Sequence, residues 1–250
     1  MYYSKLINFI NTPTFDKITD VALVGGGSYP QPGEISLAHN GVLFLDEMPE
    51  FKRTVLEVMR QPLEDREVTI SRARFTVNYP ASFMLVASMN PSPSGFFPDD
   101  PNNTSSALEM QRYMNKLSGP LLDRIDIHIE VQKVEFEQLS EKRKGEKSEV
   151  IRERVLKARF TQNERYKNLN ISYNAQMGPK EIEAFCSLDD TSLTLIKLAM
   201  EKLNLSARAY DRILKVARTI ADLEGERNIL SGHISEAIQY RSLDREFWNG

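Results

Sequence analysis

The amino-acid sequence predicts an α/β domain followed by an all-helical domain. Two continuous apolar runs, at 42–45 and 83–87, have the length and composition of strands that are buried on both faces of a parallel sheet. A stretch rich in β-branched residues, at 67–77, lies between them and predicts a β-hairpin. From 193 to 220 apolar residues recur at helical spacing, which predicts consecutive helices.

The individual elements follow from the same patterns. Apolar residues at 49–60 fall on one side of a helix, so we expect a helix between the two apolar strands. We expect the hairpin to turn at 71–73, although no Asn-Gly or Asp-Gly pair marks the turn. A highly charged stretch at 148–167 predicts one long solvated helix. Ser206 is a credible N-cap for a further helix that begins after it.

Composition divides the chain into consecutive regions. Residues 20–132 are rich in Gly and Pro and hold the apolar strands, 133–170 are dominated by Glu, Lys and Arg, and 171–250 have helical periodicity. We therefore expect an α/β core, a charged helical linker and a helical C-terminal domain. Residues 1–19 form a separate N-terminal segment in this scheme.

The composition excludes several classes of protein. Hydrophobic residues make up 41% of the 250 residues, but no apolar run approaches the roughly 20 residues that a membrane helix needs. No signal peptide is recognisable, and the single cysteine, Cys186, excludes an internal disulfide framework and a cysteine-based zinc site. The formal net charge of −3 means that any contact with nucleic acid must come from a local basic cluster. These features predict a cytoplasmic protein with no membrane partner.

Two acidic residues follow the first apolar strand. Asp46 and Glu47 come directly after it, at the carboxyl end, where open α/β sheets bind ligands. In nucleoside-triphosphate hydrolases the first acid of such a pair orders the water shell of Mg²⁺, and the second activates the attacking water. The alternative is a strand that simply ends in polar solvent. Asn90 follows the second strand, and its amide reaches the same crevice if the strands are neighbours; otherwise Asn90-Pro91 is a common turn.

Two arginines are candidates for contact with phosphate. Arg124 lies between Asp123 and Asp126, so it could pair with these acids or act as an arginine finger on the nucleotide of a neighbouring subunit. Arg208 follows Ser206 at the start of a predicted helix, where its guanidinium group and the helix N-terminus could both meet a phosphate.

The predicted hairpin carries a local basic cluster. Arg72 and Arg74 lie near its turn with Phe75 beside them, and basic residues next to an aromatic ring suit contact with a nucleic-acid backbone. The alternative is an ordinary solvated hairpin tip. The glycines at 25–27 do not form a P-loop, because none of the 12 glycines is followed by lysine, and we expect a flexible surface loop there.

Four ordered blocks of the sequence resemble the AAA+ proteins related to the magnesium-chelatase ATPase subunit, and in particular their ComM (YifB) branch. The blocks are 24–47, 88–95, 117–126 and 205–223. The resemblance implies a partial AAA+ P-loop-type core, with a parallel sheet, helices and a β-hairpin insertion, followed by an all-helical lid domain. Members of the family are hexameric ATPases, and the ComM branch is associated with DNA branch migration during natural transformation.

The resemblance also implies roles for the candidate residues of the nucleotide site. Asp46 and Glu47 match the Walker B acids, and Asn90 matches sensor 1. Arg124 matches the arginine finger, and Arg208 matches sensor 2. ATP and Mg²⁺ are the implied cofactors of the complete module, with Asp46 holding the metal through water, Glu47 activating the lytic water and Asn90 positioning it.

The resemblance implies two kinds of partner. The complete protein would be a homo-oligomer, a hexameric ring. The hairpin at 67–77 matches the pre-sensor-1 hairpin, which faces the central channel in related ring motors, so Arg72 and Arg74 become candidate DNA contacts.

The chain departs from the family pattern before the first block. The family has a Walker A loop upstream of Walker B, and this sequence contains none. Residues 1–19 do not resemble the corresponding family segment, and the similarity begins at about Ile18. We therefore expect an incomplete module, either a fragment or a truncated gene with a new start, which hydrolyses ATP poorly or not at all on its own.

Three interpretations of the function are open. The first is the C-terminal portion of a ComM-like AAA+ ATPase that remodels DNA. The second is the ATPase motor subunit of a magnesium chelatase, which would use the same nucleotide residues. The third is a non-enzymatic remnant or interaction module that packs beside a complete AAA+ subunit and donates at most Arg124.

Overall fold

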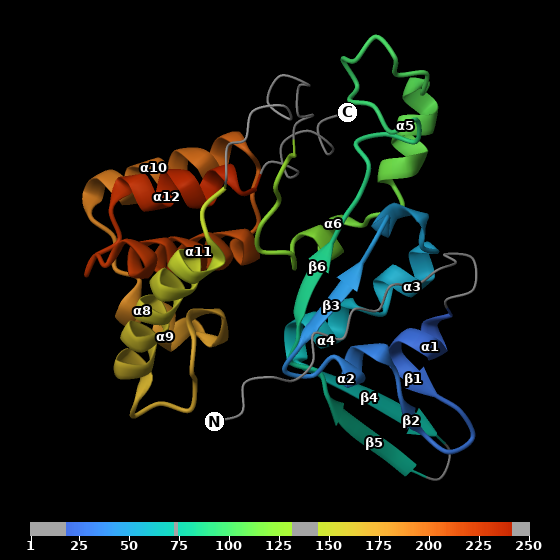
Figure 1. Cartoon of the computed structure of the whole chain (residues 1–250), viewed down its shortest axis with the longest axis horizontal. Coiled ribbons are helices and arrows are strands. Elements are labelled where there is room, and N and C mark those ends of the chain that lie inside the picture. The colour runs from blue at the N-terminus through green and yellow to red at the C-terminus, as the bar shows by residue number, and fades with distance from the viewer. Residues whose placement is uncertain (1–18, 73–74, 132–144, 242–250) are drawn as a thin grey trace. The chain divides into compact units, whose positions relative to one another are not determined.

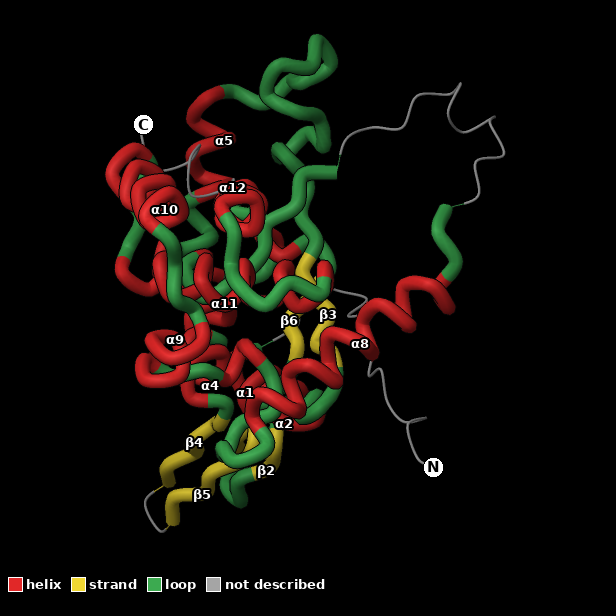
Figure 2. Tube along the Cα trace, turned by 90° about the vertical axis from the view of Figure 1, so that its left-hand side faces the viewer, coloured by secondary structure: helices red, strands yellow, loops and turns green. Residues whose placement is uncertain are grey.

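The structure is a computed structural model that describes residues 19–72, 75–131 and 145–241. The chain divides between Ile125 and Asp126 into two compact units. The strands belong to the first unit (Figure 1), and the regular elements described in the second unit are all helices (Figure 2). The predicted fold class, an α/β unit followed by an all-helical unit, is confirmed.

The described part of the first unit combines short helices with two-stranded sheets. Its helices are α1 (Asp20–Val24), α2 (Glu34–Leu37), α3 (Arg53–Glu57), α4 (Arg60–Asp65), α5 (Ala107–Met114) and α6 (Gly119–Leu122), with a 3-10 turn, η2, at Met48–Glu50. Its strands are β1 (Gly25–Gly26), β2 (Gln31–Pro32), β3 (Val42–Leu45), β4 (Glu67–Arg72), β5 (Phe75–Pro80) and β6 (Met84–Ala87).

The two apolar runs form a parallel pair. β3 and β6 lie side by side (Figure 1), with Val42 opposite Met84 and Leu45 opposite Ala87. This register aligns the carboxyl ends of the two strands, so the residues that follow Leu45 and Ala87 leave the sheet at the same edge.

The burial of the two strands differs. In β3, Leu43 and Leu45 are buried but Val42 and Phe44 are only half-buried, so the predicted burial holds for one face of this strand. In β6, Met84 and Val86 are 59% and 38% exposed, so burial on both faces is a wrong expectation for this strand in the described chain.

The single helix expected at 49–60 is replaced by short pieces. η2 ends at Glu50, α3 covers Arg53–Glu57 and α4 begins at Arg60. The break before α4 follows from Pro62, which has no N–H to donate to the carbonyl of Val58 and so cannot continue a helix through that position. The apolar side chains of the segment are nevertheless buried: Phe51, Val55, Leu56 and Met59.

The predicted hairpin is present. β4 and β5 pair antiparallel, with Glu67 opposite Pro80 and Arg72 opposite Phe75. The chain reverses between Arg72 and Phe75, slightly later than expected. Residues 73 and 74 lie outside the described part of the chain, and Arg74 is one of them.

The glycine-rich segment is more ordered than the sequence suggests. Gly25 and Gly26 form β1, which pairs antiparallel with β2, so the expected loop is wrong at these two positions. Gly25 has a φ of 104°, and a Cβ atom there would lie 2.7 Å from the backbone nitrogen of Gly33. Only glycine fits this conformation and this close approach.

The second unit is a cluster of helices around its own core. Its elements are α8 (Ser148–Tyr166), η3 (Asn174–Gln176, a 3-10 turn), α9 (Pro179–Phe185), α10 (Asp190–Lys202), α11 (Ala207–Glu224) and α12 (Ser231–Gln239). α8 matches the long helix predicted at 148–167. Buried residues from five helices meet in the core, among them Tyr166, Ile182, Ile196, Ile213 and Ile234.

The single cysteine belongs to this core. Cys186 is 5% exposed, and burial raises the pKa of its thiol to about 11. The group therefore stays protonated at neutral pH, which makes it an inert core residue.

Candidate functional site

The carboxyl ends of β3 and β6 bring the acidic pair next to Ser88. The hydroxyl of Ser88 donates to Asp46 Oδ1, and the backbone N–H of Glu47 lies 3.1 Å from Asp46 Oδ1 and 3.2 Å from Ser88 Oγ. Backbone hydrogen bonds from Ser88 N to Leu45 O (2.9 Å) and from Met48 N to Ser88 O (2.8 Å) extend the parallel ladder past the strands. Side chain and backbone together therefore join the two strand ends.

The carboxylate of Asp46 has one oxygen available. Its side chain is exposed, and Oδ1 accepts the bonds from Ser88 and Glu47, whereas Oδ2 has no donor among the described residues. Mg²⁺ prefers oxygen ligands and is usually held by one or two carboxylates, water and substrate phosphates. Asp46 and Glu47 fit that donor set. The described residues contain no group of three or more His, Cys, Asp or Glu that could hold a metal ion, so water and phosphate oxygens would supply the remaining ligands.

Glu47 has a strained backbone. Its φ and ψ are both 49°, in the left-handed region, which costs a non-glycine residue about 1–2 kcal/mol. The N–H bonds to Asp46 and Ser88 on one side, and the buried residues Met48 and Pro49 on the other, hold this conformation. Such strain concentrates at functional sites.

Asn90 follows β6 and is contacted from α5. The hydroxyl of Tyr113, a residue only 5% exposed, donates to the backbone oxygen of Asn90 at 3.2 Å. Burial, together with the negative charges of Glu50 and Glu47, raises the pKa of Tyr113 to about 12, although its bond to Asn90 opposes the shift. The carboxylates of Glu47 and Glu50 therefore lie near enough to Tyr113 to raise its pKa. Together with the bond to Asn90, this places both acids, Asn90 and Tyr113 in one region.

Two residues of this region are not predicted by the sequence. Ser88 lies within the stretch that precedes Asn90, and its place directly after β6, level with Asp46, is the signal that could have found it. Tyr113 is 23 residues beyond Asn90 and belongs to no motif, so only the packing of α5 reveals it.

Arg124 is paired within the first unit. Its Nη2 lies 2.6 Å from Glu64 Oε2, its Nη1 donates to Pro120 O at 2.6 Å, and its side chain is 9% exposed. The partner is thus an acid of α4. Of the two acids that flank Arg124 in sequence, Asp126 pairs with Arg212.

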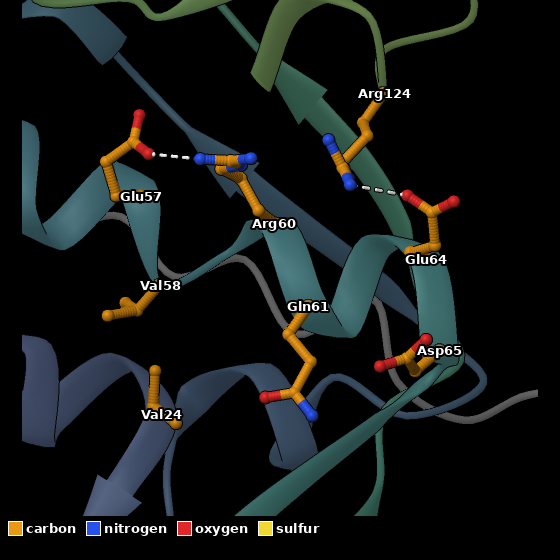
Figure 3. Close-up of a pocket in the computed structure, with 8 residues that line it drawn as sticks. All are labelled: Val24, Glu57, Val58, Arg60, Gln61, Glu64, Asp65 and Arg124. Carbon is orange, nitrogen blue, oxygen red and sulfur yellow. Dashed lines mark hydrogen bonds and ion pairs between the residues drawn. The ribbon is translucent and has the colours of Figure 1, made fainter. Parts of the chain in front are cut away.

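The Arg124–Glu64 pair lies in a pocket of about 510 Å³ (Figure 3). A second ion pair, between Arg60 and Glu57 at 2.7 Å, lines the same pocket. The bond of Glu57 to Ser118 lowers the pKa of Glu57, and Arg60 lowers it further against the effect of burial. Three buried atoms here have no hydrogen-bond partner among the described residues: Glu57 Oε1, Arg60 Nε and Arg124 Nε. The structure brings Arg124 to this pocket and not into contact with Asp46 or Glu47.

Arg208 lies in the second unit, in the first turn of α11, and is exposed. The hydroxyl of Ser206 accepts the N–H of Ala209 at 3.2 Å, so the predicted N-cap is confirmed. Arg208 and the Walker B candidates thus belong to different units of the chain.

Arg72 is exposed at the end of β4, and it contacts backbone oxygens. Its Nε donates to Gly27 O at 3.1 Å and its Nη1 to Ser71 O at 3.0 Å. A second bond, from Tyr79 Oη to Pro30 O at 2.9 Å, also joins the hairpin to the glycine-rich segment. Arg74, the other candidate DNA contact, is outside the described residues.

The chain belongs to the magnesium chelatase family. The family model described as magnesium chelatase, subunit ChlI, matches residues 9–139, and the model of the ChlI C-terminal region matches residues 145–241. The first match includes residues 9–19, which lie outside the resemblance seen in the sequence. This family is of the AAA+ ATPase type.

The relatives place the chain near the ComM and YifB proteins, as the four sequence blocks predict. It is 52% identical to competence protein ComM of Haemophilus influenzae over 225 residues, which cover 90% of this chain and 43% of ComM. It is 45% identical to YifB of Escherichia coli K12 over 225 residues, 90% of this chain and 44% of YifB. A chloroplastic magnesium-chelatase subunit ChlI of Glycine max is 22% identical over 249 residues, 93% of this chain and 51% of that subunit. The chain therefore spans less than half the length of ComM and YifB.

A membrane span is not among the described elements. No helix in the part of the chain that the structure describes is both long and apolar enough to cross a bilayer.

Proposed function

We propose that this chain carries the Walker B, sensor 1 and arginine-finger part of an AAA+ ATPase that couples ATP hydrolysis to DNA branch migration or remodelling. The observation that carries the proposal is the joined carboxyl end of β3 and β6, where Ser88 bonds to Asp46 and Tyr113 holds Asn90. The 52% identity to ComM, against 22% to a chelatase subunit, favours work on DNA over metal insertion into a tetrapyrrole.

Each residue of this edge has a chemical task in the proposal. Bound Mg²⁺ would neutralise phosphate charge and polarise the phosphoryl group. Ser88 fixes the Asp46 carboxylate, which would hold the metal through water. Glu47 accepts a proton from the attacking water on a carboxylate oxygen, and the Asn90 amide orients that water.

The remaining candidates act between parts of a hexameric ring. Arg124 would stabilise charge on the nucleotide of a neighbouring subunit, for which it must exchange Glu64 for a phosphate oxygen. Arg208 would contact the nucleotide of its own subunit, and Arg72 and Arg74 would contact DNA in the channel. We place this ring in the cytoplasm.

The 1–250 polypeptide by itself is expected to be a poor ATPase. It contains no Walker A loop, whose backbone N–H groups and lysine hold the β- and γ-phosphates. Titration with a labelled ATP analogue and Mg²⁺ should detect little binding, and Mg-ATP hydrolysis should not exceed that of Glu47→Gln. Tight binding that Asp46→Ala abolishes would contradict this expectation, and would point to the glycine-rich segment as a phosphate site.

The function itself is tested on the longest natural polypeptide that contains this sequence. We expect its ATPase activity to rise on addition of DNA, and Glu47→Gln to abolish hydrolysis while nucleotide binding is retained. Glu149→Gln, the same change on an exposed residue of α8, is the matched control and should leave hydrolysis unchanged.

Other results would reject the proposal in distinct ways. Hydrolysis that depends on Glu47 and ignores DNA would favour the chelatase motor. Hydrolysis that Glu47→Gln leaves intact would remove the Walker B assignment. Complete absence of nucleotide binding in the natural polypeptide would favour the non-enzymatic interaction module.

A further inference from the structure

The second unit contains a polar pocket that the proposed function does not use. It has a volume of about 540 Å³ and is lined by residues of α8, of the end of α9, and of α11 with the loop that follows it. The charged residues that line it are Arg165, Arg218, Arg227, Asp222 and Glu226. Three guanidinium groups against two carboxylates give this lining a formal charge of +1.

Two of these arginines share one buried carboxylate. Asp222 contacts Arg165 through both of its oxygens and Arg218 through Oδ1, which lies 3.1 Å from Arg218 Nε. The side chains of Arg165 and Arg218 are only 14% and 3% exposed. Burial lowers the pKa of Arg218, and the charge of Arg165 adds to this while Asp222 opposes it. The buried cluster thus has one positive charge more than its carboxylate can neutralise, an arrangement that is costly without an anion.

The hydrogen bonds within the cluster do not use every N–H group of its arginines. An arginine side chain has five N–H groups. Arg165 donates to Asn174 Oδ1 (3.1 Å) and to the two oxygens of Asp222, and all of these bonds come from its Nη atoms. Arg165 also forms a side-chain hydrogen bond with Tyr166, so one of its five N–H groups is left for a further acceptor. A guanidinium N–H at a pocket wall can donate to an anion.

The rim of the pocket supplies further donors. Arg227, Asn228 and Ser187 are exposed residues of the pocket lining, and their side chains have no partner among the described residues. A tetrahedral oxyanion could accept hydrogen bonds from several of these groups at once, because it has oxygens on every side and guanidinium groups match their spacing.

We propose that this pocket is a binding site for a phosphate group. A phosphate balances the excess positive charge of the Arg165–Asp222–Arg218 cluster. Its oxygens accept hydrogen bonds from N–H groups that have no acceptor within the protein. A purely structural role explains part of the cluster, since Arg218 also donates to the backbone oxygens of Glu226 (2.7 Å) and Arg227 (2.8 Å) and so fastens the end of α11. That role does not account for the unbalanced charge of the cluster.

Isothermal titration of the purified chain with inorganic phosphate in a chloride-free buffer tests the site. We expect saturable binding in the millimolar range or tighter. Arg165→Gln removes the excess charge and the open N–H, and should weaken phosphate binding by about tenfold or more. Arg152→Gln, the same change on an exposed residue of α8 outside the pocket, is the matched control and should bind like the wild type.

A second variant covers the risk that Arg165→Gln does not fold, since Arg165 also joins α8 to α11. Arg227→Gln lies on an exposed loop and should lower the affinity about threefold without loss of helicity. The proposal is overturned if no saturable binding occurs up to about 10 mM phosphate. It is also overturned if Arg227→Gln and the folded form of Arg165→Gln both bind phosphate like Arg152→Gln.

Competition distinguishes the sources of the phosphate group. Displacement of phosphate by single-stranded DNA would assign the pocket to a nucleic-acid backbone, and displacement by ATP without any effect of DNA would assign it to a nucleotide. Glu47→Gln is expected to bind phosphate unchanged, because Glu47 belongs to the first unit. The phosphate site and the proposed ATPase function can therefore fail independently.

Discussion

The hydroxyl group of Ser88 bonds to both members of the acidic pair, through Asp46 Oδ1 and the N–H of Glu47. Ser88→Ala should lower the free energy of unfolding by about 1 kcal/mol, since both bonds are lost and Glu47 remains in its left-handed conformation. Urea denaturation measures this change. Ser88→Thr, which retains the hydroxyl, should recover most of the stability, and Ser187→Ala, an exposed serine, should have no effect. Equal stability of Ser88→Ala and the wild type would show that the two hydrogen bonds of Ser88 contribute nothing to the free energy of unfolding.

Tyr113 offers a spectroscopic test of the same region. Burial disfavours its phenolate, so its pKa in the folded protein is about 12, above the ordinary value of about 10. The resulting stabilisation is fully present below about pH 10 and is lost as the pH rises from about 10 to about 12. Burial also raises the pKa of Tyr166, and the bond to Glu236 raises that of Tyr240, so absorbance at 295 nm should show several late-titrating tyrosines, of which Tyr113→Phe removes one. A titration curve that Tyr113→Phe leaves unchanged would refute the buried assignment.

The sequence predicts which acids and amide leave the sheet together, but not how they are held. Asp46, Glu47 and Asn90 could be placed because each lies within three residues of the end of an apolar run, and parallel strands in register end at one edge. The bond from Tyr113 and the pairing of Arg124 with Glu64 join residues far apart in sequence, so they depend on how α4 and α5 pack. No local pattern carries that information.

At the scale of elements, the contact between β1 and the start of α2 is the least tolerant of change. A Cβ atom on Gly33 would lie 2.3 Å from the backbone nitrogen of Gly25, and backbone cannot move away as a flexible side chain can. Gly33→Ala should therefore cost about 3 kcal/mol or more in the free energy of unfolding. Gly232→Ala in α12 meets nothing within 4 Å and should be neutral or stabilising by up to about 1 kcal/mol. Thermal denaturation of both variants checks the contrast, and a stable Gly33→Ala protein would contradict it.

The elements that the sequence predicts best are those with one dominant signal. β3, α8 and α11 follow from an apolar run, a charged helical stretch and a capped amphipathic pattern. The single helix predicted at 49–60 is divided in the structure, because its apolar spacing is helical while Pro62 interrupts the backbone bonds. The glycine-rich segment departs from the predicted flexible loop, because glycine is also required where two backbones approach closely.

At the scale of the whole molecule, the two units should unfold separately, because each has its own buried residues. Asp222→Asn leaves Arg165 and Arg218 buried without a carboxylate, which should destabilise the second unit by about 3 kcal/mol. Calorimetry should show two unfolding transitions. Asp222→Asn should lower the midpoint temperature of the second unit, and Gly33→Ala should lower that of the first. Asp190→Asn, on the exposed first turn of α10, is the control. A single transition that both variants shift equally would show that the units unfold as one.

The attachment of the hairpin to the glycine-rich segment has a mechanical consequence. Arg72 and Tyr79 bond to backbone oxygens of that segment, so a force that pulls on β4 and β5 is passed directly to it. The segment continues from α1, whose last residue, Val24, lines the pocket of Arg124. Backbone that is packed as closely as at Gly25 yields little under load. The hairpin is therefore connected, through the glycine-rich segment and α1, to a residue that lines the pocket of Arg124.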